Sequence, residues 1–174
     1  MSEQPGRYQR SASGMIGAML VLLLVIAAFV AFRAINRTQP DNPVRPVDYQ
    51  QTLRYARDQA DFPLLAPASL PRGWRATSVT FVPEPVRWHL GVLTDQDEYV
   101  GLEQSRSSLA TMVERYVDAN AVEGRVVRVD GKPWRRWTDA GGDVALTRVQ
   151  AGVTTLVVSD AGEDVLVDFT EALR

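Results

Sequence analysis

Cysteine is absent from the 174 residues of this chain, so neither a disulfide framework nor thiolate chemistry is available to it. The sequence also lacks a Gly-x-Ser-x-Gly nucleophile elbow, a phosphate-binding loop, a dinucleotide fingerprint and a zinc-ligand spacing. Histidine and lysine occur once each, as His89 and Lys132. The sequence therefore predicts no catalytic residue, no cofactor and no bound metal, and we expect a protein that is not an enzyme.

Positive charge is also scarce in the larger part of the chain. The whole chain has a formal net charge of −2 at pH 7, and residues 46–174 hold 14 basic and 19 acidic side chains. Nucleic-acid binding requires a basic surface that neutralises phosphates, so this composition argues against a nucleic-acid partner. It argues equally against wide adhesion to anionic lipid.

One long apolar stretch stands out against this background. Residues 14–32 contain no charged residue and no proline, and Arg10 and Arg33 flank them. A helix rises about 1.5 Å per residue, so roughly 20 apolar residues cross a hydrocarbon core about 30 Å thick. We therefore predict one transmembrane helix over residues 14–35, with the lipid bilayer as its partner. A cleaved signal peptide is the alternative, although its apolar run is usually only about 7–15 residues long.

The orientation of this helix is not decided by charge. Arg7 and Arg10 lie before it and Arg33 and Arg37 lie after it, so the positive-inside rule discriminates little. We expect residues 1–13 to be a cytoplasmic tail because they are few, with the folded part outside the cell membrane.

A pair of small residues lies near the start of the same helix. Gly14 and Ala18 are one turn apart, a spacing that lets two membrane helices approach closely. The pair predicts a homodimer contact. The alternative is that small residues are simply common in membrane helices.

The rest of the chain divides into a spacer and one domain. Residues 36–47 contain three prolines, which prevent a helix from continuing and favour a semi-extended spacer. Residues 48–174 have the length of one ordinary domain and can bury a core without disulfides or metal. We predict that these residues form an extracytoplasmic α+β domain.

Periodicity and turn signals predict three helices and seven strands in this domain. Antiparallel hairpins are expected around the acidic loop at 95–98, at Asp130-Gly131 and at Ala151-Gly152. The helices are predicted after Asp48, after Ser107 or Ser108, and after Asp160, each of which has a capping side chain. The predicted strands cover residues 76–82, 87–94, 99–104, 125–129, 132–138, 144–149 and 153–159. In the first strand, Thr77, Val79 and Phe81 are expected to share one face.

The fold class that follows is an antiparallel sheet of about seven strands with packed helices. This order of elements is loosely similar to the Mog1/PsbP-like fold. The last segment has a second interpretation, since Val165, Val167 and Phe169 alternate as in a strand. That interpretation exposes Leu166 and Leu173, whereas a helix buries them on one face.

The stretch from Lys132 to Trp137 is the strongest candidate for an interaction surface. Arginine and tryptophan together are typical of protein interfaces and of cation–π contacts, so Trp134, Arg135, Arg136 and Trp137 are the predicted surface residues. The two tryptophans have opposite strand parity, so either one is exposed or a helix covers the second face of the sheet. The alternative is a purely structural role, with one tryptophan in the core and the arginines on a solvated face.

Two further groups of polar residues form no complete motif. His89 lies beside Trp88 on a predicted strand, and we add it to the predicted surface rather than to a catalytic site. Asp95, Asp97 and Glu98 resemble a cation-binding loop, but the glycine and glutamate that an EF-hand places later in its loop are missing. An ordinary acidic hairpin loop is the simpler interpretation.

The order of several short motifs resembles the actinobacterial DUF4245 family. The motifs are FPLLAP, LPRGW, WHLG, YVGLEQS and VDGKPW, followed by a final helix, and they occur along nearly the whole chain. The resemblance implies a membrane-anchored protein with an extracytoplasmic domain and no assigned activity. It implies no catalytic residue.

Three hypotheses for function follow. The first is a single-pass membrane protein whose domain binds a protein partner or a cell-envelope ligand without catalysis. The second is an assembly subunit that acts through its membrane helix. The third is a hydrolase whose site is assembled from scattered acids such as Glu103 and Asp139.

Overall fold

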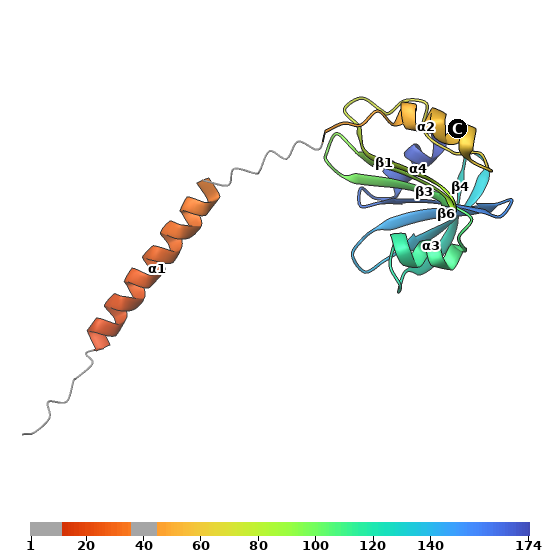
Figure 1. Cartoon of the computed structure of the whole chain (residues 1–174). Coiled ribbons are helices and arrows are strands. Elements are labelled where there is room, and N and C mark those ends of the chain that lie inside the picture. The colour runs from red at the N-terminus through yellow and green to blue at the C-terminus, as the bar shows by residue number, and fades with distance from the viewer. Residues whose placement is uncertain (1–11, 36–44) are drawn as a thin grey trace, which may run out of the picture. The chain divides into compact units, whose positions relative to one another are not determined.

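The computed structural model describes residues 12–35 and 45–174, which form two separate units (Figure 1). The first unit contains helix α1, Ala12–Ile35, where the sequence predicts a helix over residues 14–35. Within the described residues, no helix meets both the length and the hydropathy needed to cross a bilayer. The predicted tail and spacer fall almost wholly outside the described residues, and the predicted contact through Gly14 and Ala18 also lies outside what the structure describes.

The second unit is built on one sheet of seven strands, all paired antiparallel. Its spatial order is β1-β2-β3-β7-β6-β5-β4. The strands are β1 Arg75–Pro83, β2 Val86–Leu93, β3 Tyr99–Ser105, β4 Val122–Val129, β5 Lys132–Thr138, β6 Val144–Gln150 and β7 Val153–Ser159. The helices are α2 Tyr49–Gln59, α3 Leu109–Tyr116 and α4 Glu163–Glu171. The predicted α+β class with a seven-stranded antiparallel sheet is confirmed.

Helices cover both faces of this sheet (Figure 1). Helices α2 and α4 pack on one face, where Leu53 and Leu166 join a core that includes the fully buried Trp88. Helix α3 packs on the other face, where Met112 and Val113 meet Leu156 of β7. Strand β7 is buried along its whole length because it lies at the centre of the sheet, between these two layers. We call the face under α2 and α4 the main-core face and the other the α3 face.

Strand β1 corrects the predicted alternation. Its pairing with β2 shifts between Ala76 and Ser78, so Thr77 is the extra residue of a β-bulge. Ala76 is therefore buried on the main-core face, next to the partly buried Val79 and Phe81. The prediction that Thr77 shares this face is wrong. The bulge also fixes the register at which Ser78 lies opposite Gly91.

Strand β4 is longer than predicted. It begins at Val122 rather than Arg125 and passes through an irregularity between Glu123 and Val126. Periodicity misses this part because most of β4 is exposed at the edge of the sheet and carries no alternating buried side chains.

The helix caps are predicted correctly at two of the three sites. The Asp48 carboxylate accepts a hydrogen bond from the Gln50 amide at 3.0 Å, and the Ser108 hydroxyl accepts one from the Thr111 amide at 3.2 Å. The third prediction is wrong, because Gly162 precedes α4 and caps it with no side chain. The Asp160 carboxylate instead accepts from the Tyr99 amide at 2.7 Å. The helical interpretation of the C-terminal segment is confirmed.

Candidate functional site

Both tryptophans of β5 are packed against the domain, on opposite faces of the sheet. Trp134 is buried with the main core, and Trp137 is half-buried beside the α3 cluster. The Trp137 indole N–H donates to the Thr147 hydroxyl at 2.8 Å. Of the two predicted arrangements, the structure therefore has the one in which a helix, α3, covers the second face of the sheet.

The two arginines between them have different surroundings. Arg136 is half-buried and donates through Nε to the Glu163 carboxylate at 2.7 Å, which fastens the first turn of α4 to β5. Arg125 contacts the same carboxylate. Arg135 points to the other face, where its guanidinium donates to Glu123 at 2.7 Å in an exposed pair. Arg136 is thus committed to the fold, and Arg135 remains at the surface.

Strands β5 and β6 separate next to Trp134. The ladder joins Arg135–Thr138 to Val144–Thr147 and does not continue to Lys132–Trp134 and Arg148–Gln150. The β5 residues remain paired with β4, and the β6 residues remain paired with β7. The two segments therefore border an opening in the sheet, and each presents to it a backbone edge without a ladder partner in the described chain.

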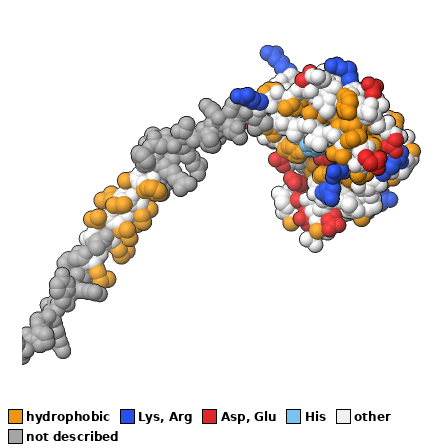
Figure 2. All heavy atoms as spheres, viewed as in Figure 1, with side chains coloured by type: hydrophobic (Ala, Val, Ile, Leu, Met, Phe, Trp, Pro, Cys, Tyr) orange, Lys and Arg blue, Asp and Glu red, His pale blue; other side chains and the backbone are white. Residues whose placement is uncertain are grey.

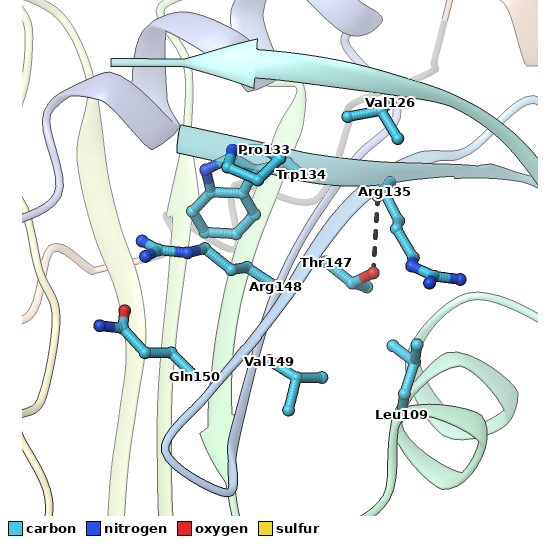
Figure 3. A pocket seen from close by; sticks show the side chains of 9 residues that line it. All are labelled: Leu109, Val126, Pro133, Trp134, Arg135, Thr147, Arg148, Val149 and Gln150. Carbon is cyan, nitrogen blue, oxygen red and sulfur yellow. Dashed lines mark hydrogen bonds between the residues drawn. The ribbon is translucent and has the colours of Figure 1, made fainter. Parts of the chain in front are cut away.

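This opening forms a groove of about 670 Å³ that is lined from both faces of the sheet, which we call the β5–β6 groove (Figure 3). Its lining residues are Leu109, Val126, Pro133, Trp134, Arg135, Thr147, Arg148, Val149 and Gln150. In Figure 3, Trp134 and Arg148 point into the same space between the two strands. A second cavity, of about 220 Å³, shares Trp134, Arg148 and Gln150 and is also lined by Thr170 and Leu173 of the α4 segment.

The groove combines apolar surface with positive charge. Val126 and Val149 are 61% and 55% exposed, so both present apolar surface to the groove. Arg148 also lines the groove, and no described carboxylate is paired with it. Such a lining suits a ligand with an anionic group and an apolar part.

His89 does not belong to this surface. It lies on β2, and β3, β7 and β6 separate β2 from β5. Its ring is held between two side chains of the neighbouring strands: Nε2 lies 2.8 Å from the Ser78 hydroxyl, and Nδ1 lies 2.5 Å from the Glu103 carboxylate. The predicted surface residues therefore separate into the β5–β6 groove and a Ser78–His89–Glu103 cluster.

Two tyrosines lie close to Glu103. Burial, together with the charges of Glu103 and Tyr116, raises the pKa of Tyr99 to about 12. Burial, followed by the charge of Glu103, raises the pKa of Tyr116 on α3. Both phenols therefore keep their protons at neutral pH and remain hydrogen-bond donors.

The acidic loop forms no cation site. Asp97 pairs with Arg75, and the Thr94 hydroxyl accepts hydrogen bonds from the amides of Gln96 and Glu98, which closes an ordinary turn. In the described part of the chain, no group of three or more histidine or carboxylate side chains is arranged to hold a metal ion.

The two scattered acids have separate partners. Glu103 binds His89, and Asp139 accepts from the amides of Gly142 and Asp143 at 2.8 and 2.9 Å. Burial and then the charge of Asp139 raise the pKa of Asp143. Asp139 is therefore part of a turn, and its known contacts do not involve Glu103.

The comparison with protein families agrees with the motif order. Residues 7–173 match a family described as "Protein of unknown function (DUF4245)". The chain belongs to the DUF4245 family. A search among curated proteins gave no match. The DUF4245 match thus covers α1, the whole sheet, the groove and the Ser78–His89–Glu103 cluster, and it assigns no activity to any of them.

Proposed function

We propose that this DUF4245 chain is a single-pass membrane protein whose extracytoplasmic domain binds a partner in the β5–β6 groove. The observation that carries the binding role is the groove itself. It places the exposed Val149, the Trp134 indole and the Arg148 guanidinium around one opening of the sheet. Its volume of about 670 Å³ is typical of ligand sites.

The anchor is proposed from α1 and its composition. Its large apolar side chains from Met15 to Ile26, and Phe29, are each about half exposed or more, and they surround the helix (Figure 2). Exposing so much apolar surface to water is unfavourable by roughly 25 cal/mol for each Å². A bilayer around residues 14–35 removes this cost, and the uncharged sequence of residues 14–32 favours it.

The preferred ligand is an extended acidic segment of a protein partner. The free edge of Arg148–Gln150 can pair with an added strand, as in β-augmentation, whereas on the β5 side Pro133 has no amide proton to donate. Arg148 and Arg135 then offer guanidinium groups to carboxylates of that segment, while Val126 and Val149 offer apolar contact. An anionic envelope ligand of similar width is the alternative occupant.

The groove favours binding over turnover. Its lining includes no histidine and no carboxylate, so no side chain there is suited to act as a general base. Function through α1 alone, as an assembly subunit, is the second candidate, and the exposed apolar side chains of α1 favour it. It predicts that a chain ending after residue 47 keeps the cellular function, whereas the groove proposal predicts its loss.

Photocrosslinking in cells tests the groove. A crosslinking amino acid replaces Val149 in the full chain, and the control replaces Tyr55, which is 61% exposed on α2. We expect a discrete adduct from position 149 that Arg148→Glu abolishes and that the matched exposed substitution Arg54→Glu preserves. An adduct that persists in Arg148→Glu, or the same adduct from position 55, would contradict the proposal.

A further inference from the structure

The Ser78–His89–Glu103 cluster is a connected relay across three adjacent strands. An ionised carboxylate only accepts hydrogen bonds, so the Glu103 contact at 2.5 Å places a proton on His89 Nδ1. His89 Nε2 is then free to accept from the Ser78 hydroxyl at 2.8 Å. The side chains thus follow the order nucleophile, base and orienting acid that activates serine in acyl-transfer enzymes.

The backbone of the sheet is shaped to permit this arrangement. The β-bulge at Thr77 sets Ser78 opposite Gly91, next to the Thr80–His89 pair. A Cβ on Gly91 would lie only 2.3 Å from the Ser78 hydroxyl oxygen, so any larger residue there would displace the serine. His89 and Glu103 are direct partners in the β2–β3 register.

Burial is graded along the relay. The Glu103 side chain is 7% exposed, and the His89 side chain is 25% exposed and reaches the surface of the domain (Figure 2). Ser78 is half-buried. The carboxylate is therefore shielded from water, and the reactive end of the relay is open to a molecule that approaches the sheet.

Tyr99 supplies a donor beside the nucleophile. Its hydroxyl oxygen would lie 3.3 Å from a Cβ on Gly91, the same point that the Ser78 hydroxyl approaches. The raised pKa of Tyr99 keeps this hydroxyl protonated at neutral pH. It can donate to an oxygen that gains negative charge during attack by Ser78.

We propose that Ser78 is an activated nucleophile that accepts acyl groups from esters, with His89 as its general base and Glu103 as a positioning residue. Neither the β5–β6 groove nor the second cavity includes Ser78, and the neighbouring His89 side chain is 25% exposed, so we expect the ester carbonyl to approach from the surface of the sheet. This site is separate from the β5–β6 groove and does not depend on the binding function proposed for it.

The reaction balances with the groups present and water. As the Ser78 oxygen attacks the ester carbonyl, its proton passes to His89 Nε2, and the carbonyl electron pair moves to the oxygen. The tetrahedral intermediate collapses, the C–O bond to the alcohol breaks, and the alcohol leaves with the proton from Nε2. Water then attacks the acyl-serine by the same route and releases the acid and free Ser78.

Covalent labelling of the full chain tests the proposal. A fluorophosphonate probe phosphonylates an activated serine and releases fluoride, and mass spectrometry locates the modified residue. We expect modification at Ser78 and none in Ser78→Ala, while Ser69→Ala, at an exposed serine, labels as the wild type does. The labelling rate should fall roughly 10²–10⁴-fold in His89→Gln.

The positioning role of Glu103 is tested by the labelling rates of two substitutions at this residue. Glu103→Asp should recover part of the labelling rate that Glu103→Gln loses, because aspartate keeps the carboxylate that orients His89. Circular dichroism and thermal unfolding verify that each variant is folded, and Ser78→Ala is the least disruptive of them. Labelling of Ser78 no faster than that of Ser69, or a rate unaffected by His89→Gln, would overturn the proposal.

Discussion

The geometry of the Ser78–His89–Glu103 cluster depends on a few individual residues. Their contacts with one another cannot be recognised from the sequence alone. His89 is noticeable because it is the only histidine, but nothing nearby in the chain indicates its partners. Ser78 lies 11 residues before it and Glu103 lies 14 residues after it, and both contacts arise from strand pairing. The sequence has no nucleophile elbow around a serine, but the fold places the Ser78 hydroxyl and the Glu103 carboxylate on the two ring nitrogens of His89.

Gly91→Ala should disturb this cluster specifically. The new Cβ would overlap the Ser78 hydroxyl, so we expect the free energy of unfolding to fall by about 1–3 kcal/mol and Ser78 labelling to be lost. Urea unfolding measures the first effect. Gly124→Ala is the control, because its Cβ would meet Arg136 at an ordinary distance of 3.6 Å. Equal stability of the two variants would contradict the tight contact.

The phenol of Tyr99 should ionise at a higher pH than that of an unfolded tyrosine. Its pKa is raised to about 12, mainly by burial and then by Glu103, whereas an unfolded tyrosine ionises near 10. The stability that neutral Tyr99 contributes is therefore complete below pH 10 and is lost between about pH 10 and 12. Phenolate absorbance measures this, and Tyr99→Phe should remove the late step, whereas Tyr55→Phe should leave it. A titration in which Tyr99→Phe removes a step near pH 10 would contradict the assignment.

The sequence predicts the secondary-structure elements more completely than it predicts the contacts of individual side chains. Turn signals and alternation identify all seven strands, because hairpins such as Asp130-Gly131 are encoded locally. The errors occur where a tertiary contact takes a side chain away from its local role. Asp160 fits a helix cap in sequence, yet the Tyr99 amide of β3 holds its carboxylate. The bulge at Thr77 and the opening between β5 and β6 leave no local signal either.

Helix α4 shows how the domain replaces a missing cap. Gly162 offers no side chain, and Glu163 in the first turn instead binds Arg136 and Arg125 of the sheet. We expect Glu163→Gln to lower the free energy of unfolding by about 1–2 kcal/mol, because it leaves a half-buried guanidinium without its carboxylate.

Glu171→Gln is the matched control on the exposed side of the same helix, and it should change stability by less than about 0.5 kcal/mol. Urea unfolding of both variants gives the comparison. A Glu163→Gln protein as stable as Glu171→Gln would show that the ion pairs contribute nothing to the docking of α4.

At the scale of the whole molecule, the sequence predicts the α+β fold class, but not the order of the strands in the sheet. Pairing of β3 with β7 joins residues about 50 to 60 positions apart, and no local pattern encodes it. The strand order also determines where in the sheet the two candidate sites lie. It places β5 and β6 together at one side, where they separate into the groove, and β1 to β3 at the other, where they assemble the relay.

The absence of cysteine allows one measurement to test the central claim, that the domain lies outside the membrane with a partner in its groove. Single cysteines replace Val149 in the groove and Val122, which is 65% exposed on β4 and does not line the groove. A membrane-impermeant maleimide is applied to intact cells and to the purified full chain. The account predicts that Val122→Cys reacts in both, whereas Val149→Cys is protected in cells and reacts after purification. Equal reaction of Val149→Cys in both samples, or no reaction of Val122→Cys in intact cells, would contradict it.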